Sequence, residues 1–221
     1  MEELREIRNA FDVSINSDGS YLIFAQPYED GFINNLGPLA VWKFSNNDQL
    51  VFRTDFPISK KDYFDLCRIS DEEYYLSYFD KDYPENPASV IYHSIDGGNN
   101  WNFIKSHTNI KALSLEYSTI DQKVKAAYYI EDESSSAVIF SEDALADDII
   151  STSSEIETSN HSFANTKLII TDDNKLWFVY NEIIQHTQDY SHSEILYLSS
   201  GDNGDTWSGE LILLSMLVMI F

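Results

Sequence analysis

Short apolar runs, separated by polar turns, dominate the pattern along this chain. The runs at residues 21–24, 74–76, 90–92 and 195–198 are rich in β-branched, leucine and aromatic residues, which is typical of strands. No long stretch repeats its apolar positions with the 3.6-residue period of an amphipathic helix. The pattern therefore predicts an all-β protein built from many short strands.

Two polar turns share one sequence pattern, Ser-x-Asp-x-Gly-x-x-Trp, at residues 94–101 and 200–207. Each lies between two strand-like runs, so each predicts a β-hairpin. The glycine supplies a positive φ, the serine and aspartate can bond nearby amides, and the tryptophan supplies apolar surface. We interpret all of these roles as structural. The residues concerned are Ser94, Asp96, Gly98, Trp101, Ser200, Asp202, Gly204, Thr206 and Trp207.

Both turns belong to a longer repeat. Degenerate copies at Ser45 and Ser141 place the four serines at positions 45, 94, 141 and 200. A second kind of turn, which is acidic, recurs at positions 18, 71, 121 and 172. Periods of roughly 50 residues are typical of propeller blades that contain four strands each. Two turn types that recur in phase predict four blades.

The Ser-x-Asp pattern resembles the Asp-box of sialidase-like (BNR) β-propellers. The resemblance implies an Asp-box β-propeller with about four four-stranded antiparallel blades, and a structural role for the box. Because sialidases have six blades, the resemblance favours an incomplete ring over a closed four-bladed one, and the chain is expected to be a fragment or a truncated reading frame. The expected parts are a lead at 1–9, a propeller at 10–214 with blades at 10–57, 60–106, 110–153 and 160–212, and an apolar tail at 215–221. The polar segment at 151–162 is expected to be a loop between blades.

Charge narrows the range of partners. The formal net charge is −23, which repels nucleic-acid backbones and anionic lipid. The apolar C-terminal segment, residues 211–221, is too short to span a bilayer.

Cys67 is the single cysteine, so no disulfide can form within the chain. The N-terminus does not have the pattern of a secretory signal, which favours the cytoplasm by default, and the sequence leaves the oligomeric state open. No cofactor motif is present, so no cofactor is expected.

In sialidase-like proteins the active site lies on the face formed by the loops between the second and third strands (B–C) and by the links between blades (D–A). By resemblance, Arg68 would match the first sialate-binding arginine, and Asp80 or Asp82 would match the catalytic acid. The departures are that Ser70 replaces a proline and that the chain has no arginine after Arg68. Sialidases grip a carboxylate with three arginines, so we favour an ordinary salt bridge for Arg68.

Other candidates lie in the predicted B–C loops. Aromatic residues there are candidate ligand contacts, since aromatics dominate recognition surfaces. A His/Asp group in the longest loop could ligate a metal, but a solvated polar loop is the preferred interpretation and no metal is predicted. The candidates are Tyr28, Phe32, Tyr83, His186, Asp189, Tyr190 and His192.

Three functional hypotheses follow. The first is a non-catalytic recognition module that binds a glycan or a protein on the B–C/D–A face. The alternative is a sialidase-like exo-glycosidase that is incomplete in this chain. The third is a degenerate reading frame that retains no function.

Overall fold

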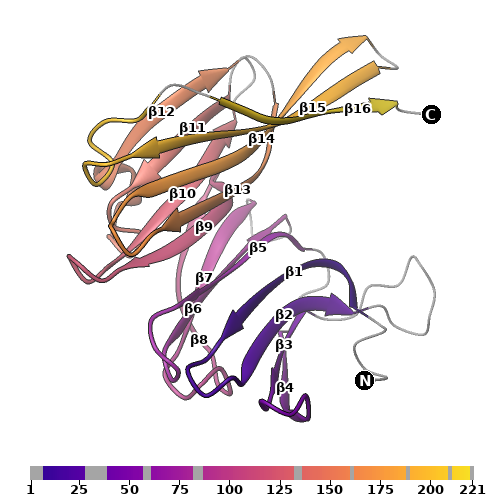
Figure 1. Cartoon of the computed structure of the whole chain (residues 1–221), viewed down its shortest axis with the longest axis vertical. Coiled ribbons are helices and arrows are strands. Elements are labelled where there is room, and N and C mark those ends of the chain that lie inside the picture. Colours follow the sequence, from indigo (N-terminus) through magenta and orange to yellow (C-terminus); the bar gives the residue numbers. More distant parts are fainter. Residues whose placement is uncertain are drawn as a thin grey trace. The chain divides into compact units, whose positions relative to one another are not determined.

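A computed structural model describes residues 7–27, 39–56, 61–81, 87–131, 136–159, 162–187, 190–208 and 211–219 (Figure 1). The chain divides into two compact units, residues 1–108 and 109–221. The described residues form sixteen strands and one short 3-10 helix, η2 (Ile149–Thr152). None of these described segments is a helix long and apolar enough to cross a membrane.

The first unit contains two four-stranded antiparallel sheets, each with its strands in chain order. Their strands are β1 (Ile7–Ile15), β2 (Tyr21–Pro27), β3 (Leu39–Phe44) and β4 (Leu50–Phe56), followed by β5 (Lys61–Arg68), β6 (Tyr74–Asp80), β7 (Ala88–Ser94) and β8 (Asn102–Thr108).

The second unit repeats this arrangement in sheets β9–β12 and β13–β16. Their strands are β9 (Lys111–Ser118), β10 (Lys123–Glu131), β11 (Ser136–Ser141) and β12 (Ser153–Ser159), followed by β13 (Ser162–Ile170), β14 (Leu176–Thr187), β15 (Tyr190–Ser200) and β16 (Leu211–Met219). The predicted all-β fold of four four-stranded antiparallel sheets is therefore confirmed.

Three segments differ from the sequence-based prediction. The polar segment expected as a loop at 151–162 contains β12, the outermost strand of its sheet. The longest predicted B–C loop, which holds the His/Asp group, is instead the end of a hairpin, because β14 continues to Thr187 and β15 begins at Tyr190. The apolar tail expected after 214 continues β16 to Met219, which pairs with Tyr190. In the last two cases the extended hairpin supplies the backbone partners.

The core of the first unit lies between its two sheets. Leu22, Phe24 and Val41 of the first sheet pack with Leu76 and Tyr78 of the second, and all five are almost completely buried. Aromatic rings join the two sheets edge to face, as in the pair Phe24–Phe64 at 5.4 Å between centroids. One apolar face of each sheet is thereby removed from water, and this burial drives the sheets together.

The first strands of neighbouring sheets are joined in the same way in both units. Asp12 of β1 accepts a hydrogen bond at 2.9 Å from the backbone N–H of Leu66 in β5, 54 residues further along the chain. Ser114 of β9 accepts one at 3.0 Å from the N–H of Leu168 in β13, again 54 residues further. The repeat that the sequence shows as recurring turns is thus also a repeat of contacts between sheets.

Candidate functional site

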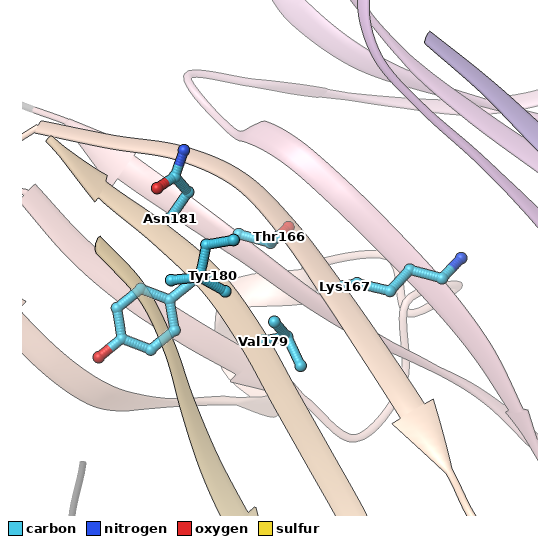
Figure 2. Close-up of a pocket in the computed structure, with 6 residues that line it drawn as sticks. Thr166, Lys167, Val179, Tyr180 and Asn181 are labelled. Carbon is cyan, nitrogen blue, oxygen red and sulfur yellow. The ribbon is translucent and has the colours of Figure 1, made fainter. Parts of the chain in front are cut away.

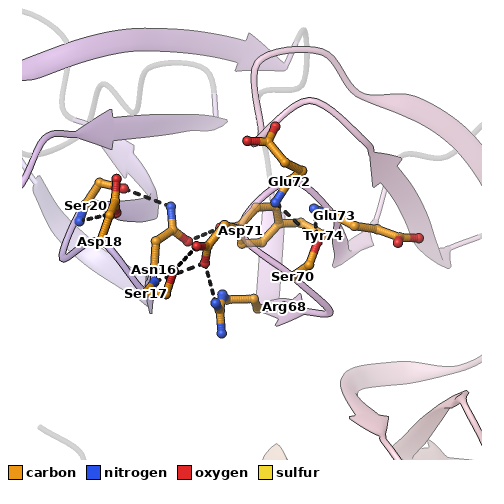
Figure 3. A network of polar contacts seen from close by, with 10 residues as sticks. All are labelled: Asn16, Ser17, Asp18, Ser20, Arg68, Ser70, Asp71, Glu72, Glu73 and Tyr74. Atoms are coloured by element: carbon orange, nitrogen blue, oxygen red, sulfur yellow. Dashed lines mark hydrogen bonds and ion pairs between the residues drawn. The ribbon is translucent and has the colours of Figure 1, made fainter.

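Arg68 lies at the end of the first strand of its sheet. It is the last residue of β5, where the chain enters the turn to β6, and it forms an ion pair with Asp71 of the same turn (Figure 3). The hydrogen bond to Asp71 raises the pKa of the Arg68 guanidinium. Because an intrachain carboxylate already holds this guanidinium, the structure supports the salt-bridge interpretation.

Asp71 joins the two sheets of the first unit. It accepts hydrogen bonds from the hydroxyl of Ser17 and, at 3.0 Å, from the backbone N–H of Ser17 in the turn between β1 and β2. Nearby, the hydroxyl of Tyr74 donates to the side-chain oxygen of Asn16. The bonds from Ser17, followed by the bond from Arg68, lower the pKa of Asp71 to about 2. In Figure 3 the two turns face each other across this network, which links the two sheets of the first unit.

Asp80 lies at the opposite end of the same sheet. Arg68 pairs with Tyr74, the first residue of β6, whereas Asp80 is the last residue of β6. Six residues of strand separate them by roughly 20 Å. The structure therefore does not bring Arg68 and Asp80 together, and Asp80 is 8% exposed.

Arg53 is the other arginine whose side chain the structure describes, and it too is engaged. Its Nε lies 2.6 Å from Oδ1 of Asp55, and its guanidinium carbon lies 5.2 Å from the centroid of a Trp42 ring. It belongs to β4, the outermost strand of its sheet. A planar grip on a ligand carboxylate needs guanidinium groups that converge on one point, and Arg53 and Arg68 lie on separate elements with partners of their own.

Several predicted contacts fall where the structure makes no statement. Five of the candidate residues lie outside the described residues, and for two more only the backbone is described. The first group is Tyr28, Phe32, Asp82, Tyr83 and Asp189, and the second is His186 in β14 and Tyr190 in β15.

His192 is the one member of the predicted His/Asp group whose side chain is described. It lies in β15 opposite Ile184, and its Nε2 is 3.0 Å from the Glu194 carboxylate. Among the described residues, no group of three or more histidine, cysteine, aspartate or glutamate side chains could hold a metal ion. The structure therefore pairs this histidine with a carboxylate of its own strand.

Each Ser-x-Asp turn joins the third and fourth strands of its sheet and contains one hydrogen-bond pattern. In the first, Ser94 Oγ donates to Asp96 and accepts from the N–H of Gly98 at 3.0 Å. Asp96 accepts from the N–H of Asn100 at 2.9 Å, and Trp101 Nε1 donates to the Gly98 carbonyl at 2.7 Å. Five residues thus close a compact loop that leaves its polar groups internally bonded.

The second turn repeats these bonds atom for atom. Ser200 Oγ donates to Asp202 at 2.7 Å and accepts from the N–H of Gly204 at 2.9 Å. Asp202 accepts from the N–H of Thr206 at 2.9 Å, and Trp207 Nε1 donates to the Gly204 carbonyl at 3.1 Å. The bonds from Thr206, together with the one from Ser200, lower the pKa of Asp202 to about 2. Both carboxylates are engaged inside their own turns.

An irregularity of the first strand recurs towards the other end of the sheets, where the second strand leads into the third. We call this the B–C end. There, the first strand of each sheet carries a bulge or register shift, which falls at Ile7–Asp12, Asp62–Phe64, Lys111–Ser114 and Ala164–Thr166. Bulges re-aim side chains and are over-represented next to active sites.

Two of these irregular segments contain a residue in the left-handed region. Tyr63 has φ 58° and Ala112 has φ 50°. Such a conformation is rare for a bulky residue and costs of order 1–3 kcal/mol. Tyr63 is half-buried, with its ring 6.2 Å from that of Phe79. Sequence reasoning missed Tyr63, because neither a bulge nor a positive φ has a signature in the residue itself.

A shallow hollow of about 230 Å³ lies on the fourth sheet, lined by Thr166, Lys167, Val179, Tyr180, Asn181 and Ile195 (Figure 2). The hydroxyl of Ser193 donates to the amide oxygen of Asn181, and Thr166 donates to the Ala112 carbonyl. Ligand pockets usually measure 300–1,000 Å³. The hollow is smaller than that, so it is a weaker candidate ligand site than the B–C end of the sheets.

Comparison with solved structures identifies the architecture. A mannose phosphorylase from Leishmania mexicana matches with a TM-score of 0.62 and 10% identity, over 93% of this chain and 69% of that protein. An exo-β-1,3-galactanase from Phanerochaete chrysosporium matches with a TM-score of 0.58 and 7% identity, over 92% of this chain and 49% of that protein. A Hadza microbial sialidase matches with a TM-score of 0.50 and 10% identity, over 92% and 58%.

No protein-family model and no curated protein matches the sequence. The structural matches, at identities of 7–10%, show the fold alone, which is sialidase-like and of the propeller type. The chain spans about half to two thirds of the length of these proteins.

Proposed function

We propose that this chain is a non-catalytic recognition module that binds a glycan or a protein at the B–C ends of its sheets. The observation that carries the proposal is the irregular first strand in each sheet, with Tyr63 in a strained conformation at this end. Strain of this kind persists where the surrounding structure enforces it, and it clusters at ligand sites. A glycan is the first ligand to test, because three proteins that share the fold are named for their action on sugars.

The arginine geometry favours recognition over sialoside hydrolysis. Arg68 is paired with Asp71 at one end of β6, and Asp80 lies at the other end. We also propose that the two Ser-x-Asp turns are Asp-boxes that hold the hairpins β7–β8 and β15–β16. Their carboxylates, Asp96 and Asp202, are occupied by bonds within the turns, which supports a structural role.

A glycan array probed with the purified chain, followed by calorimetric titration of any hit, tests the proposal. The Tyr63→Ala variant should weaken binding at least tenfold, which corresponds to about 1.4 kcal/mol. The matched control is Tyr117→Ala, because Tyr117 is also a half-buried tyrosine on a first strand but lies at the opposite end of its sheet, beside Val124.

Two results would overturn the proposal. One is a folded wild-type chain that binds neither a glycan on the array nor a protein in a pull-down. The other is turnover of a fluorogenic sialoside that is abolished by Arg68→Ala, which would restore the exo-glycosidase hypothesis.

A further inference from the structure

The strand β16 forms one edge of the fourth sheet. The sheet order is β13-β14-β15-β16, and in the described part of the chain β16 hydrogen-bonds to β15 alone. Eight of its nine residues pair with β15, from Tyr190–Met219 to Tyr197–Leu211, and a register shift leaves Leu213 without a partner in that ladder. Among the described residues, the opposite side of β16 therefore presents a row of backbone N–H and C=O groups about 30 Å long.

The fourth strands of the other three sheets also lie at an edge, and they carry charges, which proteins use to prevent edge pairing. β4 contains Arg53 and Asp55, β8 contains Lys105, and β12 contains Glu155 and Glu157. The sequence of β16 is Leu-Ile-Leu-Leu-Ser-Met-Leu-Val-Met, without a charge, a proline or a glycine. The edge that lacks this protection is also the longest of the four.

We propose that β16 pairs antiparallel with β16 of a second copy of this chain, joining two fourth sheets into one eight-stranded sheet. An antiparallel edge is complementary to itself under a two-fold axis, so one strand supplies both halves of a closed interface. With the nine residues 211–219 fully overlapped, Ser215 lies opposite Ser215 of the second copy. The two-fold axis closes the assembly at two copies.

The charge of the chain selects this strand for self-association. Two copies with a net charge of −23 each repel one another, so a homodimer needs a contact strip without charge. The segment 211–219 is such a strip. Salt screens the long-range repulsion, because the Debye length shortens severalfold between about 20 and 500 mM ionic strength. Dimerisation should therefore strengthen over this range.

Size-exclusion chromatography with light scattering, over a concentration series of the full chain, tests the proposal. The wild-type chain should be a dimer, and Met216→Lys should raise the dissociation constant about 100-fold, because a buried like-charge contact costs several kcal/mol. The matched control is Phe103→Lys on β8, where Phe103 is 48% exposed, and it should leave the dimer intact. A monomeric wild type, or open-ended aggregates in place of a dimer, would refute the proposal.

Cysteine cross-linking gives a second readout that does not depend on a destabilising charge. In a Cys67→Ala background, Ser215→Cys should form a disulfide-linked dimer on mild oxidation, since opposed residues of an antiparallel pair lie 4.5–5.5 Å apart, about the range a disulfide spans. Ser106→Cys on β8 is the control, and it should run as a monomer in denaturing electrophoresis without a reducing agent. Equal cross-linking of both variants, or of neither, would exclude the β16 pairing.

Discussion

Gly204 occupies a position where any side chain should be strained. Its φ is +100°, and a Cβ atom built on it would lie 2.3 Å from Cε1 and 2.8 Å from Cδ1 of Phe140. Phe140 is 1% exposed, and its ring packs edge to face against Trp207 at 5.4 Å. The ring therefore has little room to move away from an added methyl group.

The cost of Gly204→Ala has two parts. A left-handed backbone costs roughly 1–2 kcal/mol for alanine, and overpacking a full core costs about 1–3 kcal/mol. The expected loss of unfolding free energy is therefore about 2–5 kcal/mol. Gly98→Ala should cost less, about 2–3 kcal/mol, because its Cβ would meet the end of the flexible Leu22 side chain at 2.4 Å.

Two other glycines make matched controls. A Cβ on Gly201 would meet nothing within 4 Å, so Gly201→Ala should change the unfolding free energy by about 0.5 kcal/mol or less. Gly19 has φ +82° and only one contact, Asn46 Cβ at 3.4 Å, so Gly19→Ala should lose roughly 1–2 kcal/mol from strain.

Urea unfolding followed by tryptophan fluorescence measures the series. The expected order of destabilisation is Gly204, Gly98, Gly19 and then Gly201. The double variant Gly204→Ala/Phe140→Leu should regain part of the loss, because leucine removes the ring atoms that the new methyl group meets. Equal urea midpoints for Gly204→Ala and Gly201→Ala would refute both the turn geometry and its packing against Phe140.

Two further variants test the polar contacts. The pKa of Asp202 is about 2 in the folded chain and 3.8 without its partners, so its carboxylate stabilises the fold above about pH 4, and this contribution is lost as pH falls towards 2. Urea midpoints between pH 5 and 2 should therefore depend less on pH in Asp202→Asn than in the exposed control Asp205→Asn, and equal slopes would count against the assignment. Arg68→Ala should cost about 0–1 kcal/mol in the same assay, since its ion pair is a third exposed, and should leave glycan binding unchanged; loss of binding would place Arg68 in the ligand site.

The boundaries of several elements depended on partners that the local sequence does not reveal. The segment 153–159 reads as a polar loop, yet it forms β12 because β11 offers it a row of backbone partners and its side chains belong to an outermost strand. The hairpin β14–β15 is longer than its apolar pattern predicts, because pairing with β16 continues to Met219. Propensity describes the residue, whereas pairing depends on the neighbouring strand.

The candidate site shows the same division. Arg68 and Asp80 are 12 positions apart in the sequence and look close enough to cooperate, but a single strand, β6, separates them by roughly 20 Å. Tyr63 carries no sequence signal at all, and only the register of β5 against β6 reveals the bulge that sets its φ to 58°.

The sequence by itself determined the all-β class, the four-fold repeat and the two Ser-x-Asp turns, because each depends on residues within a few positions of one another. Turn chemistry is local: Gly98 supplies its φ, and Asp96 and Ser94 bond amides of their own loop. The tertiary structure alone decided where the first strand of each sheet is irregular, which partner Arg68 takes and how far the hairpin of β14 and β15 extends. Those features depend on contacts between residues tens of positions apart, such as Ser17 with Asp71, whose free energy is gained only once neighbouring sheets have packed together.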